Sequence, residues 1–155
     1  MIIEPGIGLE SIKYGIKEKE LIVLLGSPDK VDETEYVEGS GDWNRILWYF
    51  SKNVGFTFDE EDNYRLSVIT VIGPGYTLFK KDLFGSPINT VRAFISNKTE
   101  EIPQYKDHSF LENESHECLD HHGLGILFWF DSGNLSEMQC GILFESDGET
   151  IIWPD

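Results

Sequence analysis

Apolar residues recur with helical spacing in two short segments of the chain. Leu21, Leu24 and Leu25 fall on one side of a helix predicted over Lys17–Leu25. Gly26-Ser27-Pro28 should end it, because glycine adopts a left-handed cap and proline cannot continue a helix. A second helix is predicted to have Ser86 as its N-cap and Pro87 at its first position. Its apolar face would consist of Ile88, Val91, Phe94 and Ile95.

Strand-like runs follow each predicted helix after a long polar stretch. The first set comprises Ile46–Ser51, Val54–Asp59 and Leu66–Ile72. The second comprises Leu124–Phe130 and Ser136–Phe144, joined by the turn sequence Asp131-Ser132-Gly133-Asn134. Weaker patterns suggest a strand near His116–Leu119 and an edge strand at Thr150–Trp153.

Several of these features recur seventy residues apart. Tyr14-Gly15 reappears as Phe84-Gly85, and Val54–Phe58 reappears as Leu124–Phe128. The sequence therefore predicts an α+β fold made of two tandem helix-plus-antiparallel-meander repeats, with the helices packed on one face of the sheet. The repeats would span residues 1–72 and 76–155 of a single compact unit, with Gly73-Pro74-Gly75 as the linker. Chance similarity between two α+β segments is the alternative.

Alternation along the strands sorts their side chains onto two faces of the predicted sheet. Phe56, Phe58, Ile126, Phe128 and Phe130 share the face expected to form the core. The opposite face mixes aromatic, aliphatic and hydrogen-bonding groups, which is typical of a protein–protein interface, although loops or a neighbouring subunit could cover it. It would carry Leu47, Tyr49, Thr57, Val68, Thr70, Leu127, Trp129, Glu137 and Gln139, with Tyr49 and Trp129 as the leading contact residues.

Two motifs carry a resemblance to known proteins. They are Leu24-Leu25-Gly26-Ser27-Pro28 after the first predicted helix, and Trp48-Tyr49 in the following strand. With the aromatic hairpin after them, they resemble the repeat of the β-lactamase inhibitor protein and of small outer-membrane assembly lipoproteins. The resemblance covers most of residues 7–72 and, more weakly, 76–144, where Ser96-Asn97-Lys98 replaces the Gly-x-Pro ending. It implies two α+β repeats that form a concave sheet and grip a target enzyme.

Charge narrows the classes of partner. The chain has 155 residues and a formal net charge of −16, so direct binding to nucleic acid is disfavoured. Asp29–Asp62 holds ten acids against three bases, and Glu100–Asp120 holds seven against one. Such stretches either attract a basic protein or simply keep the surface solvated. The acidic contact candidates are Glu35, Glu38, Asp42, Asp59, Glu60, Glu61 and Asp62.

Histidine, cysteine and aspartate gather in the segment His116-Glu117-Cys118-Leu119-Asp120-His121-His122. These residue types can bind zinc, nickel or copper, and in an extended segment His116, Cys118 and Asp120 would share one side. The spacing lacks the His pair at i and i+4 of a metalloprotease helix. Cys118 could also act as a nucleophile, but no oxyanion hole can be named for it. Exposed histidines in a hairpin or loop are the simpler interpretation, and no cofactor is expected.

These patterns together predict a non-enzymatic immunity or inhibitor protein that neutralises a cognate bacterial toxin, expected to be a basic nuclease. By analogy, the small acidic immunity proteins of bacterial polymorphic toxin systems fit this description. The N-terminus has no secretory pattern and no 18-residue apolar run occurs, so a cytoplasmic location without membrane contact is expected. A metal-binding protein or metalloenzyme using residues His116–His122 is the alternative, and a general interaction module is a third. The sequence does not predict an oligomeric state.

Overall fold

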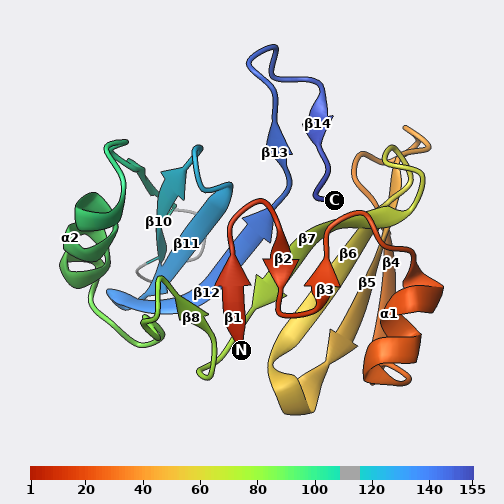
Figure 1. Ribbon diagram of the computed structural model, residues 1–155, viewed down its shortest axis with the longest axis horizontal. Coiled ribbons are helices and arrows are strands. Elements are labelled where there is room, and N and C mark those ends of the chain that lie inside the picture. Colours follow the sequence, from red (N-terminus) through yellow and green to blue (C-terminus); the bar gives the residue numbers. More distant parts are fainter. Residues whose placement is uncertain (109–115) are drawn as a thin grey trace.

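A computed structural model of the chain describes residues 1–108 and 116–155. An eight-stranded antiparallel sheet with the strand order β4-β5-β6-β7-β12-β11-β10-β9 forms its centre (Figure 1). The first four strands are β4 (Lys30–Glu35), β5 (Trp43–Tyr49), β6 (Val54–Asp59) and β7 (Arg65–Val71). The others are β9 (Gln104–Asp107), β10 (His116–His121), β11 (Ile126–Asp131) and β12 (Asn134–Gly141).

The predicted α+β class is wrong. Strands make up 45% and helices 15% of the residues that the structure describes, so the fold is mainly β and not a balanced helix-plus-meander repeat. The chain segments before and after Gly73–Gly75 share one sheet, because β7 pairs with β12 directly through Val71 and Met138. One hydrophobic core also contains residues from both of these segments.

Helix α1 (Glu18–Leu25) begins one residue after the predicted start. The Glu20 carboxylate accepts a hydrogen bond from the backbone N–H of Lys17 at 3.2 Å and so satisfies a donor at the helix start. Gly26 ends the helix with φ +83°, a conformation that favours glycine. Arg45 of β5 donates to both carboxylate oxygens of Glu18 at 2.9 Å, which fixes α1 to the sheet.

Helix α2 (Ile88–Lys98) differs from its predicted start. Pro87 is the N-cap residue rather than the first helical residue, and Ser86 lies outside the helix. The fixed φ of proline suits this position, and its missing N–H costs no hydrogen bond there. Val91 and Ile95 are fully buried, as the apolar spacing predicted.

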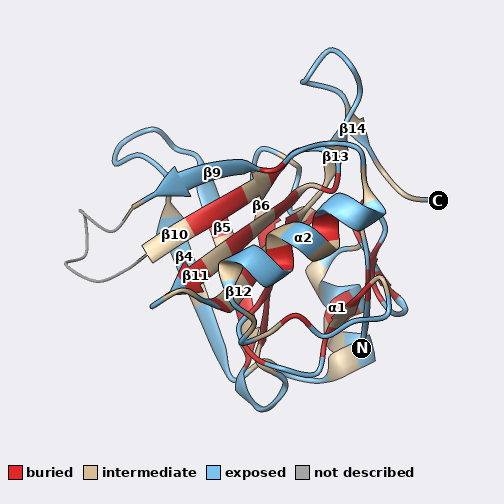
Figure 2. Cartoon of the chain, turned by 90° about the vertical axis from the view of Figure 1, so that its left-hand side faces the viewer, coloured by how far each residue is buried: buried red, intermediate tan, exposed pale blue. Residues whose placement is uncertain are grey.

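A second, smaller sheet lies on the helix side of the large one (Figure 1). Its order is β3 (Ile12–Lys13), β2 (Gly8–Leu9), β1 (Ile2–Glu4), β8 (Thr77–Leu78). Its buried residues join one core with α1, α2 and the inner face of the large sheet, as the red residues of Figure 2 indicate. The opposite face of the large sheet is therefore left without a covering layer in the described part of the chain.

The last strands depart from the main sheet. Strand β12 ends at Gly141, and the chain then forms a hairpin of β13 (Leu143–Phe144) and β14 (Ile151–Ile152), which projects from the body of the protein (Figure 1). The single strand predicted over Ser136–Phe144 is thus two strands. The strand predicted at Thr150–Trp153 pairs with β13 instead of extending an edge of the large sheet.

Candidate functional site

The outer face of the large sheet is the first part of the candidate site. We use the term open face for the side that points away from the helices, and the pairing register defines it. Thr70 pairs with Gly55 on one side and Gln139 on the other, and Gln139 pairs with Leu127. Trp48 pairs with Gly55 and lies over it. The open face comprises Ile46, Trp48, Thr57, Val68, Thr70, Leu127, Trp129, Glu137 and Gln139.

Two residues predicted for this face belong to the core. Leu47 pairs with Phe56, and Tyr49 pairs with Val54, on the helix side of the sheet. Tyr49 is only 4% exposed, and its hydroxyl donates to the carbonyl oxygen of Gly26 at 2.9 Å. The predicted placement of Tyr49 on the open face is therefore wrong, because the side chains of β5 alternate between the two faces in the opposite sense to the predicted one. Its neighbour Trp48 occupies the open face instead.

Trp48 is held in place by its neighbours. Its indole N–H donates to the Asp32 carboxylate at 3.2 Å. A Cβ atom on Gly55 would come within 2.6 Å of the Trp48 ring, so glycine is what allows the ring to lie flat against β6. Trp48 thus forms a fixed apolar surface rather than a loose side chain.

Trp129 lies at the other side of the open face among ionisable groups. The His116 ring stacks on it with a 4.7 Å centroid distance, and the His108 ring lies 5.2 Å away. His116 Nδ1 is 2.7 Å from Asp131 Oδ1, and the hydrogen bond from His116 lowers the pKa of Asp131. The Trp129 indole N–H is buried and has no acceptor among the described residues. The ring is half-buried rather than sealed inside the protein.

The predicted contact residues of the second half do come together. Leu127 pairs with Gln139, and Trp129 pairs with Glu137, on the neighbouring strands β11 and β12. Gln139 donates to Glu137 at 2.9 Å. Burial raises the pKa of Glu137, and the negative charge of Asp131 adds to that effect. This cluster combines apolar surface with a carboxylate that is partly removed from water.

The predicted carboxylates of the first half gather where the β4–β5 loop meets the β6–β7 turn. Tyr36 donates to one oxygen of Asp59, and Ser67 donates to the other at 2.5 Å. Glu60 accepts from the backbone N–H of Trp43 at 3.3 Å. Glu35 accepts from Gly39 and Gly41, and Glu38 and Asp42 are exposed on the same loop. Several of these acids therefore shape the loops as well as carrying charge.

Two clefts lie at the base of the β13–β14 hairpin, one on each side. The first, of about 350 Å³, includes Asp59, Glu61, Asp62 and Glu149 among its lining residues; we call it the acidic cleft. The second, of about 590 Å³, is lined in part by Asp120, His122 and Leu127; we call it the histidine cleft. Phe144 lines both clefts. No simple sequence signal predicted them, because their walls come from segments that are distant along the chain.

The histidine-rich segment does not converge into a metal site. Strand β10 is extended, so its side chains alternate between the two faces of the sheet. His121 pairs with Ile126 and points toward the core. His116 and Cys118, which pair with Asp131 and Trp129, belong to the open face. His121 is 1% exposed, with its Nδ1 accepting from Leu124 N–H and its Nε2 2.9 Å from Thr99 Oγ1. Within residues 1–108 and 116–155, no cluster of three or more His, Cys, Asp or Glu side chains is arranged to hold a metal ion.

The two cysteines are buried free thiols. Burial, with the charge of Asp120, raises the pKa of Cys118 to about 11, so at neutral pH the residue is a protonated thiol rather than a thiolate nucleophile. Burial raises the pKa of Cys140 to about 12, and that side chain packs in the core. Residues 109–115, which form part of the predicted acidic stretch Glu100–Asp120, lie outside the described residues.

Comparison with known proteins gives no relative on which to base a function: family models, curated proteins and solved structures all show no match to this chain. In the part of the chain that the structure describes, no helix combines the length and apolar character needed to cross a membrane.

Proposed function

We propose that this chain is a non-catalytic binding protein that neutralises a basic protein partner, as an immunity or inhibitor protein neutralises a toxin. The observation that carries the proposal is the open face: within residues 1–108 and 116–155, no helix or second sheet covers this side of the eight-stranded sheet, which presents the half-buried rings of Trp48 and Trp129. Large amphipathic rings of this kind frequently dominate the energy of protein–protein binding.

Charge complementarity supports a basic partner. The net charge of −16 repels nucleic acid and acidic proteins, whereas it attracts the cationic surface of a nuclease that binds a phosphate backbone. The carboxylates of the β4–β5 loop and the β6–β7 turn border the open face, so a partner on that face would contact both.

The two free, buried cysteines support a cytoplasmic location and a non-catalytic role. Two free thiols and no disulfide in a chain of this size suit a reducing compartment, which is consistent with the cytoplasm. The raised pKa of Cys118 gives no support to nucleophilic catalysis.

The test is growth protection by co-expression. The gene next to the one that encodes this chain is expressed alone and together with it, and growth is measured. We expect the product of the neighbouring gene to be toxic when it is expressed alone and harmless when this chain is expressed with it. A Leu127→Lys/Gln139→Lys variant, which puts two positive charges in the centre of the open face, should bind the neighbour at least about 100-fold more weakly and lose protection.

The matched control is Ala93→Lys/Asn97→Lys, which adds the same two charges to exposed positions of α2. It should protect as well as the natural chain does. A neighbouring product that is harmless alone, or equal protection by both double variants, would contradict the proposal. Circular dichroism before each assay shows that the variants are folded.

A further inference from the structure

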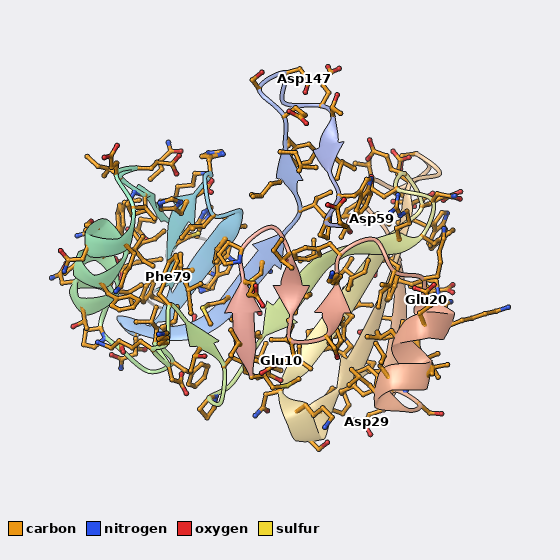
Figure 3. The ribbon with its side chains drawn as sticks, in the orientation of Figure 1. Glu10, Glu20, Asp29, Asp59, Phe79 and Asp147 are labelled. Carbon is orange, nitrogen blue, oxygen red and sulfur yellow. The ribbon has the colours of Figure 1, made fainter. Side chains whose placement is uncertain are left out.

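The β13–β14 hairpin carries apolar side chains that folding leaves in water. Phe144 is 49% exposed and Ile152 is 42% exposed. These residues stand on a narrow, projecting element, with Asp147 at its tip (Figure 3). Apolar surface on a projecting, structured element is characteristic of binding elements rather than of inert loops.

Hydrogen bonds give the hairpin a defined shape. The Asp147 carboxylate accepts from the backbone N–H groups of Glu149 and Thr150 at 2.9 Å, and from the Thr150 hydroxyl at 2.5 Å. These bonds lower the pKa of Asp147 to about 2, so the residue is ionised at all physiological pH values. The backbone N–H of Glu145 donates to the Thr150 carbonyl at 2.8 Å. The hairpin is thus preorganised, which reduces the entropy lost on binding.

The acidic cleft at the base of the hairpin combines an apolar wall with four carboxylates. Phe144, Ile142 and Ile151 form part of its wall, and Asp59, Glu61, Asp62 and Glu149 are among its other lining residues. The pKa of Asp62 is raised, first by burial and then by the charges of Asp59 and Glu61. The positive charge of Arg65 acts in the other direction and lowers the pKa of Asp62. The guanidinium carbon of Arg65 lies 4.0 Å from the centre of the Trp153 ring, and its Nε donates to the carbonyl oxygen of Gly15.

Both clefts are continuous with the open face. Val68 and Gly141 line the acidic cleft, and they pair with each other in the large sheet. Leu127 of the open face lines the histidine cleft. A partner on the open face therefore meets the base of the hairpin without any change in the sheet.

We infer that the β13–β14 hairpin and its acidic cleft dock a segment of the basic partner in which Lys or Arg alternates with apolar residues. The alkyl stem of the cation would pack on Phe144 and Ile151, and its charged head would lie among the carboxylates of Asp62 and Glu149. Apolar residues of the same segment would cover Phe144, which lines the acidic cleft. This inference rests on the proposed function for the identity of the partner, not for the docking itself.

The chemistry of the cleft selects this occupant over others. A second copy of the chain also carries a net charge of −16 and would be repelled from the cleft. Nucleic acid would be repelled for the same reason. Among the described residues no set of three metal-binding side chains is arranged for a cation alone. An aliphatic cation satisfies both the apolar wall and the carboxylates.

The test maps the docking of a synthetic peptide on the full chain by NMR. The probe is the amidated peptide acetyl-Ile-Lys-Phe-Lys-Ile-Lys, and its Lys-to-Glu counterpart is the control, both at 150 mM NaCl. We expect the largest shifts in the methyl signals of Val68, Ile142 and Ile151. The acidic peptide should produce none.

Variants separate specific docking from general attraction. Asp62→Asn/Glu149→Gln removes two charges from the cleft, and Glu38→Gln/Asp42→Asn removes two from the exposed β4–β5 loop. We expect the first pair to weaken peptide binding about tenfold and the second by less than about twofold. Phe144→Ser should also weaken binding about tenfold, because it removes the apolar wall.

The docking inference is overturned by any of three results: no binding at millimolar peptide, shifts centred outside the hairpin, or equal weakening by both charge variants. Failure of the proposed function is a separate result. A peptide that docks in the cleft of a chain that neutralises no neighbouring product supports the docking and overturns only the proposed partner. Neutralisation that is unaffected by Phe144→Ser, with no peptide binding, overturns only the docking.

Discussion

Trp48 and Tyr49 are neighbours in β5 but lie on opposite faces of the sheet, so substitutions of Tyr49 test whether it belongs to the core. Its ring packs edge-on against Phe56 with a 5.8 Å centroid distance, inside the core. We expect Tyr49→Ala to lower the free energy of unfolding by about 3–5 kcal/mol, the range for large aromatic truncations in a core. Urea denaturation of the variant and the natural chain measures this change in the free energy of unfolding. Trp48→Ala, on the open face, should destabilise less and weaken partner binding more.

Glu137 offers a residue-scale prediction about pH. Its pKa is raised in the folded protein, chiefly by burial, so the unfolded chain releases the proton at a lower pH than the folded chain does. The ionised carboxylate therefore costs folding free energy, and stability falls as the pH rises from the ordinary Glu pKa through the raised one. Glu137→Gln should remove this loss.

The measurement is urea denaturation of both proteins at intervals between pH 4 and pH 7. The advantage of the Gln variant over the natural chain should grow as the pH rises and level off above the raised pKa. An advantage independent of pH would mean that the packing of the amide, and not the charge, causes the difference. Gln139 keeps a hydrogen-bond acceptor in either protein, since it donates to the Glu137 side chain.

At the scale of elements, the β13–β14 hairpin depends on one carboxylate. Asp147→Ala removes three hydrogen bonds from the turn, so the hairpin should open more frequently while the large sheet is unchanged. Amide hydrogen exchange should accelerate at Glu145 and Thr150 by about tenfold or more, and not at Phe128. Equal acceleration at Phe128 would show that the whole protein is destabilised instead.

The elements that the sequence predicted are those with a strong apolar period. Strands β6, β7 and β11 are central and buried, and α2 has its expected buried stripe. Strands β4 and β9 were missed because edge strands with solvent-exposed, mostly polar side chains have no apolar alternation. The short strands β1, β2, β3 and β8 of the second sheet were also missed, so the strand content was underestimated and the fold class was predicted as α+β.

The apolar pattern also predicted only part of the candidate site. Trp129 was found because its strand alternates cleanly between core and open face. Tyr49 was misplaced because Trp48-Tyr49 is aromatic at both positions, so the pattern itself does not fix which side faces the core. The acidic cleft is lined by Asp59 of β6, Gly141 of β12 and Ile151 of β14, and no local sequence pattern brings such distant segments together.

At the scale of the whole molecule, charge should control the rate of partner association. The net charge of −16 creates a long-range field that accelerates encounter with a cationic protein, and salt screens this field over a Debye length of about 8 Å at physiological ionic strength. We expect the association rate constant with the basic partner to fall by about 10-fold or more between 20 and 300 mM NaCl. The dissociation rate, set by contacts on the open face, should change much less.

Stopped-flow measurements with two variants test the origin of this effect. Glu38→Gln/Asp42→Asn alters charge at the border of the open face and should lower the association rate at low salt with little change in dissociation. Trp48→Ala should do the reverse, because it removes contact area but no charge. An association rate that is indifferent to salt would mean that the acidity serves solubility alone, and that the open face binds its partner without electrostatic steering.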